Sequence, residues 1–158
     1  MPTISTPGGA IAYSRSGRGT PLVLLLPQSA GPVGVAPFAQ GLASGFAVIR
    51  YDQRGTGQSP PPSDPEAVSM ADRGQEVADL LAALGIARAH LVCHSTGCGI
   101  GLAFASAHPE RVERLALIAP WSHGDAFLTD MQTLRIAAAA ELSAQTYARF
   151  NASLLFPP

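Results

Sequence analysis

The stretch "HLVCHSTGCGIGLAFASAHPERV", residues 90–112, runs an apolar, strand-like segment directly into a serine and then into a helix-like segment. The residues two before and two after that serine, Cys93 and Gly97, are both small. A strand that only had to end would do so in a relaxed loop, whereas a tight turn between small residues holds one hydroxyl in a strained backbone conformation. The sequence therefore predicts a strand, a sharp turn with Ser95 at its tip, and a helix.

Other apolar runs of strand length surround this stretch. From the second run onward they are continuously apolar, which is typical of strands buried on both faces of a parallel sheet. The predicted strands are "AIAY" (10–13), "LVLLL" (22–26), "FAVIRY" (46–51), "AHLVC" (89–93) and "LALIA" (115–119).

Helical patterns lie between and after these runs. In residues 70–85, Val77, Leu80, Leu81 and Leu84 form an apolar stripe at helical spacing, and Gly85 ends the pattern. The other predicted helices cover residues 32–44, 96–109, 125–140 and 141–155. Alternating strands and helices with short links predict an α/β fold with a doubly wound, mostly parallel sheet and flanking helices.

Composition narrows the class of protein. The chain has 158 residues, of which 47% are hydrophobic and 13% charged, with a net charge of −1. This predicts a globular domain without a basic surface for nucleic acid or a polybasic membrane anchor. The amino-terminal residues lack the pattern of a signal peptide, and two cysteines give no disulfide framework. We therefore expect a cytoplasmic protein.

The predicted turn has a chemical interpretation as a nucleophile elbow. Ser95 Oγ would be pushed clear of the sheet, and the backbone N–H of Thr96 would point at a developing oxyanion, helped by the helix dipole. The alternative interpretation makes Ser95 a simple N-cap of a Rossmann-like helix.

At these residues the chain resembles the α/β-hydrolase fold superfamily. The segment "LVCHSTGCGIG" is similar to that family's "LVGHSxGG", with Cys93 and Cys98 where glycines are usual, and "YDQRGTGQS" (51–59) is similar to "DxRGxGxS". The segment "HPERVERLALIAP" (108–120) resembles the one that leads into the family's sixth strand. Some enol-lactone hydrolases and small esterases have similar elbows.

The resemblance implies a serine hydrolase that acts on a small ester or lactone through an acyl-enzyme, without a cofactor. Ser95 would be the nucleophile and Thr96 one oxyanion donor. The stretch "LLLPQSAGP" (24–32) takes the place of the family's "HG" oxyanion loop, so the N–H of Ser29 would be the second donor, although Pro27 and Gln28 replace the His and Gly.

The general base and its acid are harder to place. The family's chain order is serine, then an acid, then histidine. Two histidines follow Ser95. His108 would stand at the far end of a helix ~18 Å long. His123 and Asp125 are possible stand-ins for the base and acid, and the alternative role of Asp125 is a helix N-cap.

Past Trp121 the strand signal stops. We expect residues 1–121 to form the N-terminal part of an α/β-hydrolase core without its last strands, and residues 122–158 the beginning of a helical lid. The chain is therefore expected to be truncated, cleaved or half of a split enzyme. A second polypeptide would cover the open sheet edge at residues 115–119.

Other functions stay open at this point. A catalytically inactive α/β-hydrolase module that binds a small molecule or partner is the main alternative, and a cofactor-independent peroxidase-type activity is another. The histidines are scattered, so no metal site is expected. Asp52 and Arg54 are expected to be structural, with the loop after residue 51 held by an Arg–carboxylate pair.

Overall fold

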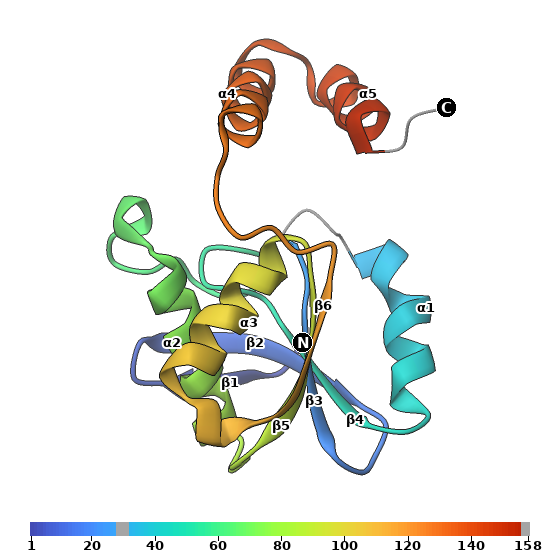
Figure 1. The fold of residues 1–158 in the computed structure, drawn as a ribbon, viewed down its shortest axis with the longest axis vertical. Helices are drawn as coiled ribbons and strands as arrows, with labels where there is room; N and C mark the ends of the chain where they lie inside the picture. The colour runs from blue at the N-terminus through green and yellow to red at the C-terminus, as the bar shows by residue number, and fades with distance from the viewer. Residues whose placement is uncertain (28–31, 156–158) are drawn as a thin grey trace. The chain divides into compact units, whose positions relative to one another are not determined.

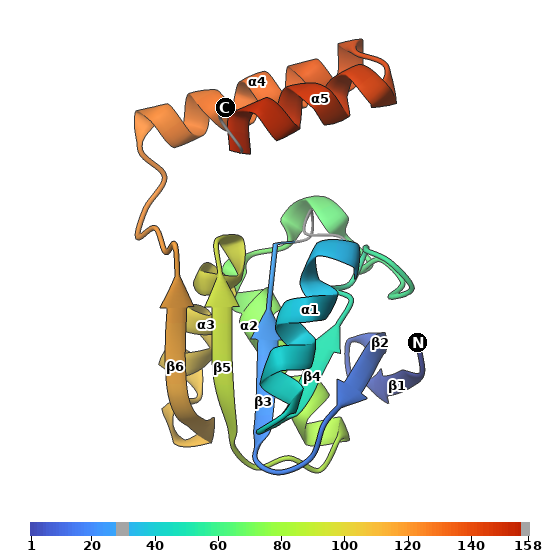
Figure 2. The same ribbon diagram turned by 90° about the vertical axis from the view of Figure 1, so that its right-hand side faces the viewer.

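The computed structural model describes residues 1–27 and 32–155 and divides into two compact units, Met1–Trp121 and Ser122–Pro158. The first unit holds a six-stranded sheet in the order β1-β2-β4-β3-β5-β6 (Figures 1 and 2). The strands are β1 (Thr3–Thr6), β2 (Gly9–Ser16), β3 (Pro21–Leu25), β4 (Ala47–Tyr51), β5 (Ala89–His94) and β6 (Val112–Ile118).

The sheet is mixed but mostly parallel. Strands β4, β3, β5 and β6 run parallel to one another, with Leu22 opposite His90 and Cys93 opposite Leu117. Strands β1 and β2 form an antiparallel extension that joins the sheet at β4. The predicted α/β class and parallel core are confirmed, whereas the short and largely polar strand β1 was not predicted.

Helices cover both faces of the sheet. Helix α1 (Pro32–Ala43) lies on one face, and α2 (Met70–Ala83) and α3 (Thr96–Ala107) lie side by side on the other (Figure 1). The described part of the first unit also holds the short 3₁₀ turns η2 (Pro65–Ala67) and η3 (Pro109–Arg111). The predicted third helix extended to residue 109; it ends at Ala107 because Pro109 begins the separate turn η3.

The larger core cluster lies between the sheet and helices α2 and α3. It includes the fully buried side chains of Leu80, Leu91, Ile100 and Phe104. The smaller cluster, under α1, is built on Leu22, Leu24 and Val48 among others. The two clusters explain why the central strands are continuously apolar, because both of their faces are removed from water.

Helix α2 has well-defined ends. Ser69 and Asp72 form a capping box, and their mutual hydrogen bonds hold the pKa of the Asp72 carboxyl below its usual value. At the other end Gly85 takes φ 68°, and Ile86 N–H donates to Leu81 O at 2.8 Å. The predicted apolar stripe is confirmed, with Val77, Leu80 and Leu81 buried.

Strand β6 is an edge strand of the sheet. Most of its side chains are exposed, including Leu117 and Ile118 at 37% and 41%. It begins at Val112, three residues before the predicted start. The prediction missed these residues because Glu113 and Arg114 are charged and interrupt the apolar run that indicated the strand.

The second unit is a helical hairpin of α4 (Ala126–Glu141) and α5 (Ala144–Leu155). Arg135 Nε donates to Asn151 Oδ1 at 2.8 Å and links the two helices. No residue of α4 is buried, and Phe127 and Ile136 are exposed by 73% and 71%. In the described ranges, no helix has the length and apolar character needed to cross a membrane.

Candidate active site

The site lies where the sheet changes its winding direction. Strands β3 and β5 are parallel neighbours, but α1 follows β3 on one face and α3 follows β5 on the other (Figure 1). In open α/β sheets such a switch point leaves a crevice outside the carboxyl ends of the strands, where ligands bind. Ser95 follows β5 directly, and the segment Leu26–Pro27 follows β3.

Ser95 is held in a conformation that L-residues rarely adopt. Its φ is 54° and its ψ −122°, and only Ser95 and Ala119 among the described non-glycine residues have positive φ. Its N–H donates to Ile118 O at 3.0 Å, and its carbonyl accepts from Cys98 N–H at 2.8 Å. These bonds hold both sides of the turn in place against the backbone strain.

The Ser95 side chain does not cap helix α3. Although Ser95 occupies the N-cap position, its hydroxyl makes no capping hydrogen bond. An ordinary serine N-cap accepts a bond from an amide in the first turn and has an extended backbone. The N-cap interpretation therefore does not describe this turn, and the half-buried hydroxyl is left available for another partner.

The small residues around the serine are needed for close packing. A Cβ on Gly97 would lie 2.3 Å from Leu25 O, at the end of β3. A Cβ on Gly101 would lie 2.4 Å from Cys93 Sγ. Helix α3 therefore approaches the backbone of β3 and the side chain of Cys93 as closely as glycine allows.

Both cysteines of the elbow are buried and free. Burial raises the pKa of the Cys93 thiol to about 12, with a further contribution from the neighbouring Cys98. A thiol with so high a pKa is protonated at neutral pH and is a poor nucleophile. Cys93 therefore acts as a small apolar residue beneath the turn rather than as a reactive group.

Only one of the two predicted oxyanion donors lies in the part of the chain that the structure describes. Thr96 is the first residue of α3, where a backbone N–H has no partner within its own helix. Ser29 lies outside the described residues, as does Gln28. The role of both donors stays a prediction.

Two of the histidines pack their rings away from the elbow turn. The ring of His90 meets Phe46 edge-on at 5.4 Å, near the start of β5. The ring of His108 packs on Phe104 at 5.4 Å, at the far end of α3 from Ser95. His94 ends β5 and is half-buried. These positions fit structural roles for His90 and His108.

The two stand-ins for base and acid belong to the second unit. His123 Nδ1 lies 3.0 Å from Ser122 Oγ, and both side chains are exposed. Asp125 is the N-cap of α4, and its Oδ1 accepts the Leu128 N–H at 2.8 Å. Asp125 thus has the capping role that the sequence offered as an alternative, and its part in catalysis stays a prediction.

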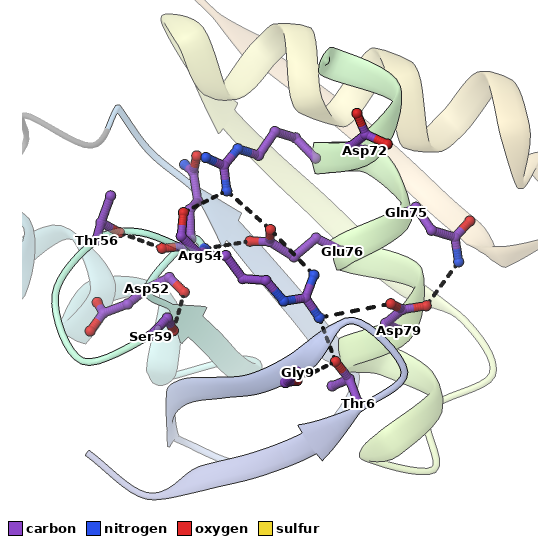
Figure 3. A network of polar contacts seen from close by, with 12 residues as sticks. Thr6, Gly9, Asp52, Arg54, Thr56, Ser59, Asp72, Gln75, Glu76 and Asp79 are labelled. Carbon is purple, nitrogen blue, oxygen red and sulfur yellow. Dashed lines mark hydrogen bonds and ion pairs between the residues drawn. The ribbon is translucent and has the colours of Figure 1, made fainter. Parts of the chain in front are cut away.

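The loop after β4 is held by buried charges (Figure 3). The Arg54 guanidinium lies 3.6 Å from Glu76 and also pairs with Asp79. Glu76 accepts the Arg54 backbone N–H at 3.1 Å and pairs with Arg73 at 3.1 Å. The expected Arg–carboxylate pair is present, with carboxylates from α2 rather than Asp52, which instead accepts the Gln58 N–H at 2.9 Å.

Burial raises the pKa values of two groups near this network. Burial raises the pKa of the Glu76 carboxyl, although bonds from Arg54 and Arg73 act in the opposite direction. Burial, assisted by Glu76, also raises the pKa of the Tyr51 hydroxyl well above its usual value. The network stabilises the connection between β4 and α2 and lies outside the elbow itself.

Two contacts of the site were not predicted from sequence. Gln53 is buried just after β4, and its Nε2 donates to Leu26 O at 3.4 Å. The Ile118 carbonyl at the end of β6 accepts the Ser95 N–H. For Gln53, the only signal in the sequence is a polar amide side chain within "DQRG", directly after an apolar strand, and it is weak. The Ile118 contact leaves no signal, because every residue type has a backbone carbonyl.

Within residues 1–27 and 32–155, no group of three or more His, Cys, Asp or Glu side chains is arranged to hold a metal ion. The described part of the site thus consists of a strained serine and a helix amino terminus, beside the carboxyl ends of two parallel strands. Together these features have the strand–turn–helix arrangement of a nucleophile elbow.

Comparison with known proteins agrees with that arrangement. The chain belongs to the alpha/beta hydrolase fold family, whose model matches residues 21–157. A protein of Caulobacter sp. (strain K31) named "Putative carbamate hydrolase RutD" is 37% identical over 123 residues, which are 77% of this chain and 45% of that protein. The chain therefore spans about half the length of the curated relatives it matches.

Solved structures show the same fold. The enol-lactonase from Burkholderia xenovorans LB400 is 26% identical with a TM-score of 0.69, over 98% of this chain and 65% of that one. MGS-M2, an alpha/beta hydrolase enzyme from a deep-sea metagenome library, has a TM-score of 0.81 at 22% identity, over 91% of this chain and 53% of that one.

Proposed function

We propose that this chain carries the nucleophile and oxyanion half of a serine hydrolase that cleaves a small ester or lactone through an acyl-enzyme. The observation that carries the proposal is the strained, uncapped Ser95 at the β3/β5 switch point. Backbone strain at a crevice persists only where the surrounding structure imposes it, and it gathers at functional sites. The similarity to an enol-lactonase supports the lactone as a substrate class.

The chemistry follows from the elbow. Ser95 Oγ attacks the substrate carbonyl while its proton passes to a base, and a tetrahedral oxyanion forms. The Thr96 N–H, at the positive end of α3, stabilises that oxyanion, and Ser29 N–H is proposed as the second donor. The intermediate expels the alcohol, which takes the proton from the base, and water then releases the acid from Ser95 by the reverse sequence.

We propose that the base and acid come from a polypeptide segment outside these 158 residues. His90 and His108 already pack against aromatic rings, which argues against either as the base. Within the chain, His123 and Asp125 remain the candidates. Replacing His123 by Asn tests them: a loss of Ser95 reactivity of about 100-fold or more assigns the base to His123, and an unchanged reactivity assigns it elsewhere.

The same outside segment is proposed to cover strand β6. Parallel strands are normally buried on both sides, yet β6 exposes Leu117 and Ile118 at the sheet edge. A polypeptide paired with β6 would bury these side chains and satisfy its free backbone groups. The two free cysteines further support the proposal that the protein works in the cytoplasm.

A carbamate is a second candidate substrate, because a relative named as a carbamate hydrolase is 37% identical to this chain. The same attack by Ser95 on the carbonyl of a carbamate ester would break the C–O bond, release the alcohol and leave a carbamoyl-enzyme. Steady-state hydrolysis of a matched ester, lactone and carbamate, compared as kcat/KM, distinguishes these substrate classes.

Covalent labelling of the serine tests the proposal directly. The protein is treated with a fluorophosphonate probe and its intact mass is measured against the 16.3 kDa of this chain. We expect one adduct on Ser95, its loss in Ser95→Ala, and its retention in Ser44→Ala, which changes an exposed serine. A wild-type protein that stays unlabelled and inert toward all three substrates, while the covering polypeptide is present in the same sample, would favour the inactive binding module. An additional protein species in the same mass spectrum would identify the covering polypeptide.

A further inference from the structure

Cys98 lies in the first turn of α3 and contacts the elbow on two sides. It is 1% exposed, and its Sγ lies 3.4 Å from both Cys93 O and Ile118 O. Its own N–H donates to Ser95 O at 2.8 Å. Cys98 thus contacts three backbone carbonyl groups: one near the end of β5, that of Ser95, and one at the end of β6.

The Ile118 carbonyl is where these contacts meet. It accepts the Ser95 N–H at 3.0 Å and is within reach of the Cys98 S–H. The next residue, Ala119, has φ 50° and is the other described non-glycine residue with positive φ. Among the described residues, the two non-glycine positions with positive φ are therefore joined through one carbonyl group, and the Cys98 thiol is directed at it.

We propose that Cys98 is a positioning residue for Ser95, acting through the carbonyls of Cys93 and Ile118; this inference rests on the proposed function. A thiol has one proton, so it donates to one carbonyl at a time and shares it between the two. An S–H···O bond is weak, but these acceptors are buried, where losing a donor is more costly than at the surface.

The position of the bond explains how a weak contact affects the nucleophile. Cys93 O precedes Ser95 on one side of the turn, and Cys98 N–H follows it on the other. The thiol therefore limits rotation of the turn relative to the end of β6. Catalysis depends on placing the attacking oxygen within a fraction of an ångström, so a small loosening lowers kcat more than it raises KM.

Three variants separate hydrogen bonding from packing. Cys98→Ser keeps a donor in a slightly smaller side chain, Cys98→Ala removes the donor, and Ser106→Ala is a control at an exposed position of the same helix. We expect Cys98→Ala to lower kcat and the fluorophosphonate labelling rate by about threefold to tenfold, with KM within about twofold. Cys98→Ser is expected to stay within about twofold of wild type on all three measures.

If Cys98 acted only by packing, the rates of the variants would rank differently. Serine and alanine would then lower the rate equally, or serine would lower it more because it adds a hydroxyl to a buried site. Equal rates in all variants, or equal losses in Cys98→Ser and Cys98→Ala, would overturn the proposal.

Hydrogen exchange gives a second measurement that does not depend on catalysis. We expect Cys98→Ala to speed exchange of the Ser95 and Cys98 amides by about fivefold or more relative to amides of α2, and Cys98→Ser to leave them unchanged. If wild-type Ser95 does not react with the probe, the proposed function fails while this measurement still decides the role of Cys98. Unchanged elbow amides in Cys98→Ala would contradict it.

Discussion

The N–H of Ser95 donates to the carbonyl oxygen of Ile118 at 3.0 Å, so the ladder between β5 and β6 continues one residue beyond the end of β5. The preceding residue, His94, lies opposite Ile118 in the parallel register. A sheet hydrogen bond therefore fixes the backbone amide of Ser95, the residue at the tip of the turn, whose φ is 54°. The strained serine is held in place by the sheet, and its position depends on the end of β6.

The first prediction concerns the cost of that strain. Ser95→Gly is expected to stabilise the protein by about 1 kcal/mol, because relief of ~1–3 kcal/mol of backbone strain exceeds the glycine's entropic cost of ~0.5–1 kcal/mol. Urea unfolding measures the change. Ser106→Gly, in the last turn of α3, is the control and should destabilise by up to about 0.5 kcal/mol, because glycine is a poorer helix former than serine. Destabilisation in both variants would show that the turn stores no strain.

The close approach of α3 to β3 gives the second prediction. Gly97→Ala is expected to destabilise the protein by ~1–3 kcal/mol or more, because its Cβ would lie 2.3 Å from Leu25 O and the backbone must move. In Gly99→Ala, two residues along the same helix, the nearest neighbour is Met70 Sδ at 3.3 Å, at the end of a flexible side chain. That control should be neutral or slightly stabilising by thermal unfolding. Equal losses would contradict the packing argument.

The elbow was predictable from the sequence because its tight packing requires small side chains at particular positions. Gly97 is small since a Cβ would strike Leu25, and this need is visible in the sequence as "CHSTG". The apolar central strands were predictable for a similar reason, because burial on both faces excludes polar residues. Strand β1, "TIST", alternates between exposed and half-buried residues and is short, so it left no comparable signal.

The remaining parts of the site depend on backbone groups and on pairing between distant segments. The Ile118 carbonyl reaches Ser95 only because β6 pairs with β5, and any residue at position 118 would supply that carbonyl. Glu76 as the partner of Arg54 was likewise hidden, because several carboxylates were equally available in sequence and only the packing of α2 selects it.

An unpaired hydroxyl gives the third prediction. Tyr51 OH is buried without a hydrogen-bond partner among the described residues, so the folded state bears its desolvation cost. Tyr51→Phe is therefore expected to leave the free energy of unfolding unchanged or raise it by up to about 1 kcal/mol. Ser59→Ala is the contrast, since Ser59 Oγ donates to Asp52 O at 2.6 Å and accepts from Ala12 N–H at 2.9 Å. It should destabilise by ~1–3 kcal/mol in urea.

Alkaline pH gives the fourth prediction. The pKa of Cys93 is raised by burial from 9.0 to about 12, so between those values the native state holds a proton that the unfolded state has lost. Stability should therefore fall as pH rises through this window and be unaffected by Cys93 below about pH 8. Urea unfolding between pH 7 and 11 measures the slope, which should be shallower in Cys93→Ala. The same slope in both proteins would show that Cys93 does not contribute; the Tyr51 hydroxyl adds a slope of the same sign to both.

The fifth prediction concerns the buried charges that hold the loop after β4. Glu76 is 3% exposed and pairs with both Arg54 and Arg73. Glu76→Gln keeps the shape of the side chain but leaves two guanidinium groups without their shared buried counter-charge, which is expected to cost ~3–5 kcal/mol.

The exposed ion pair between Arg88 and Glu113, at 3.3 Å, provides the matched control. Glu113→Gln should cost less than about 1 kcal/mol, because water screens that pair and solvates the arginine that remains. Both variants are compared with wild type by urea unfolding at neutral pH and low salt, and again at about 1 M salt. Added salt should remove the small effect of Glu113→Gln and leave most of the effect of Glu76→Gln, since ions do not reach the buried pair. A loss of under 1 kcal/mol in Glu76→Gln would show that Arg54 and Arg73 find other partners and that the loop does not depend on this carboxylate.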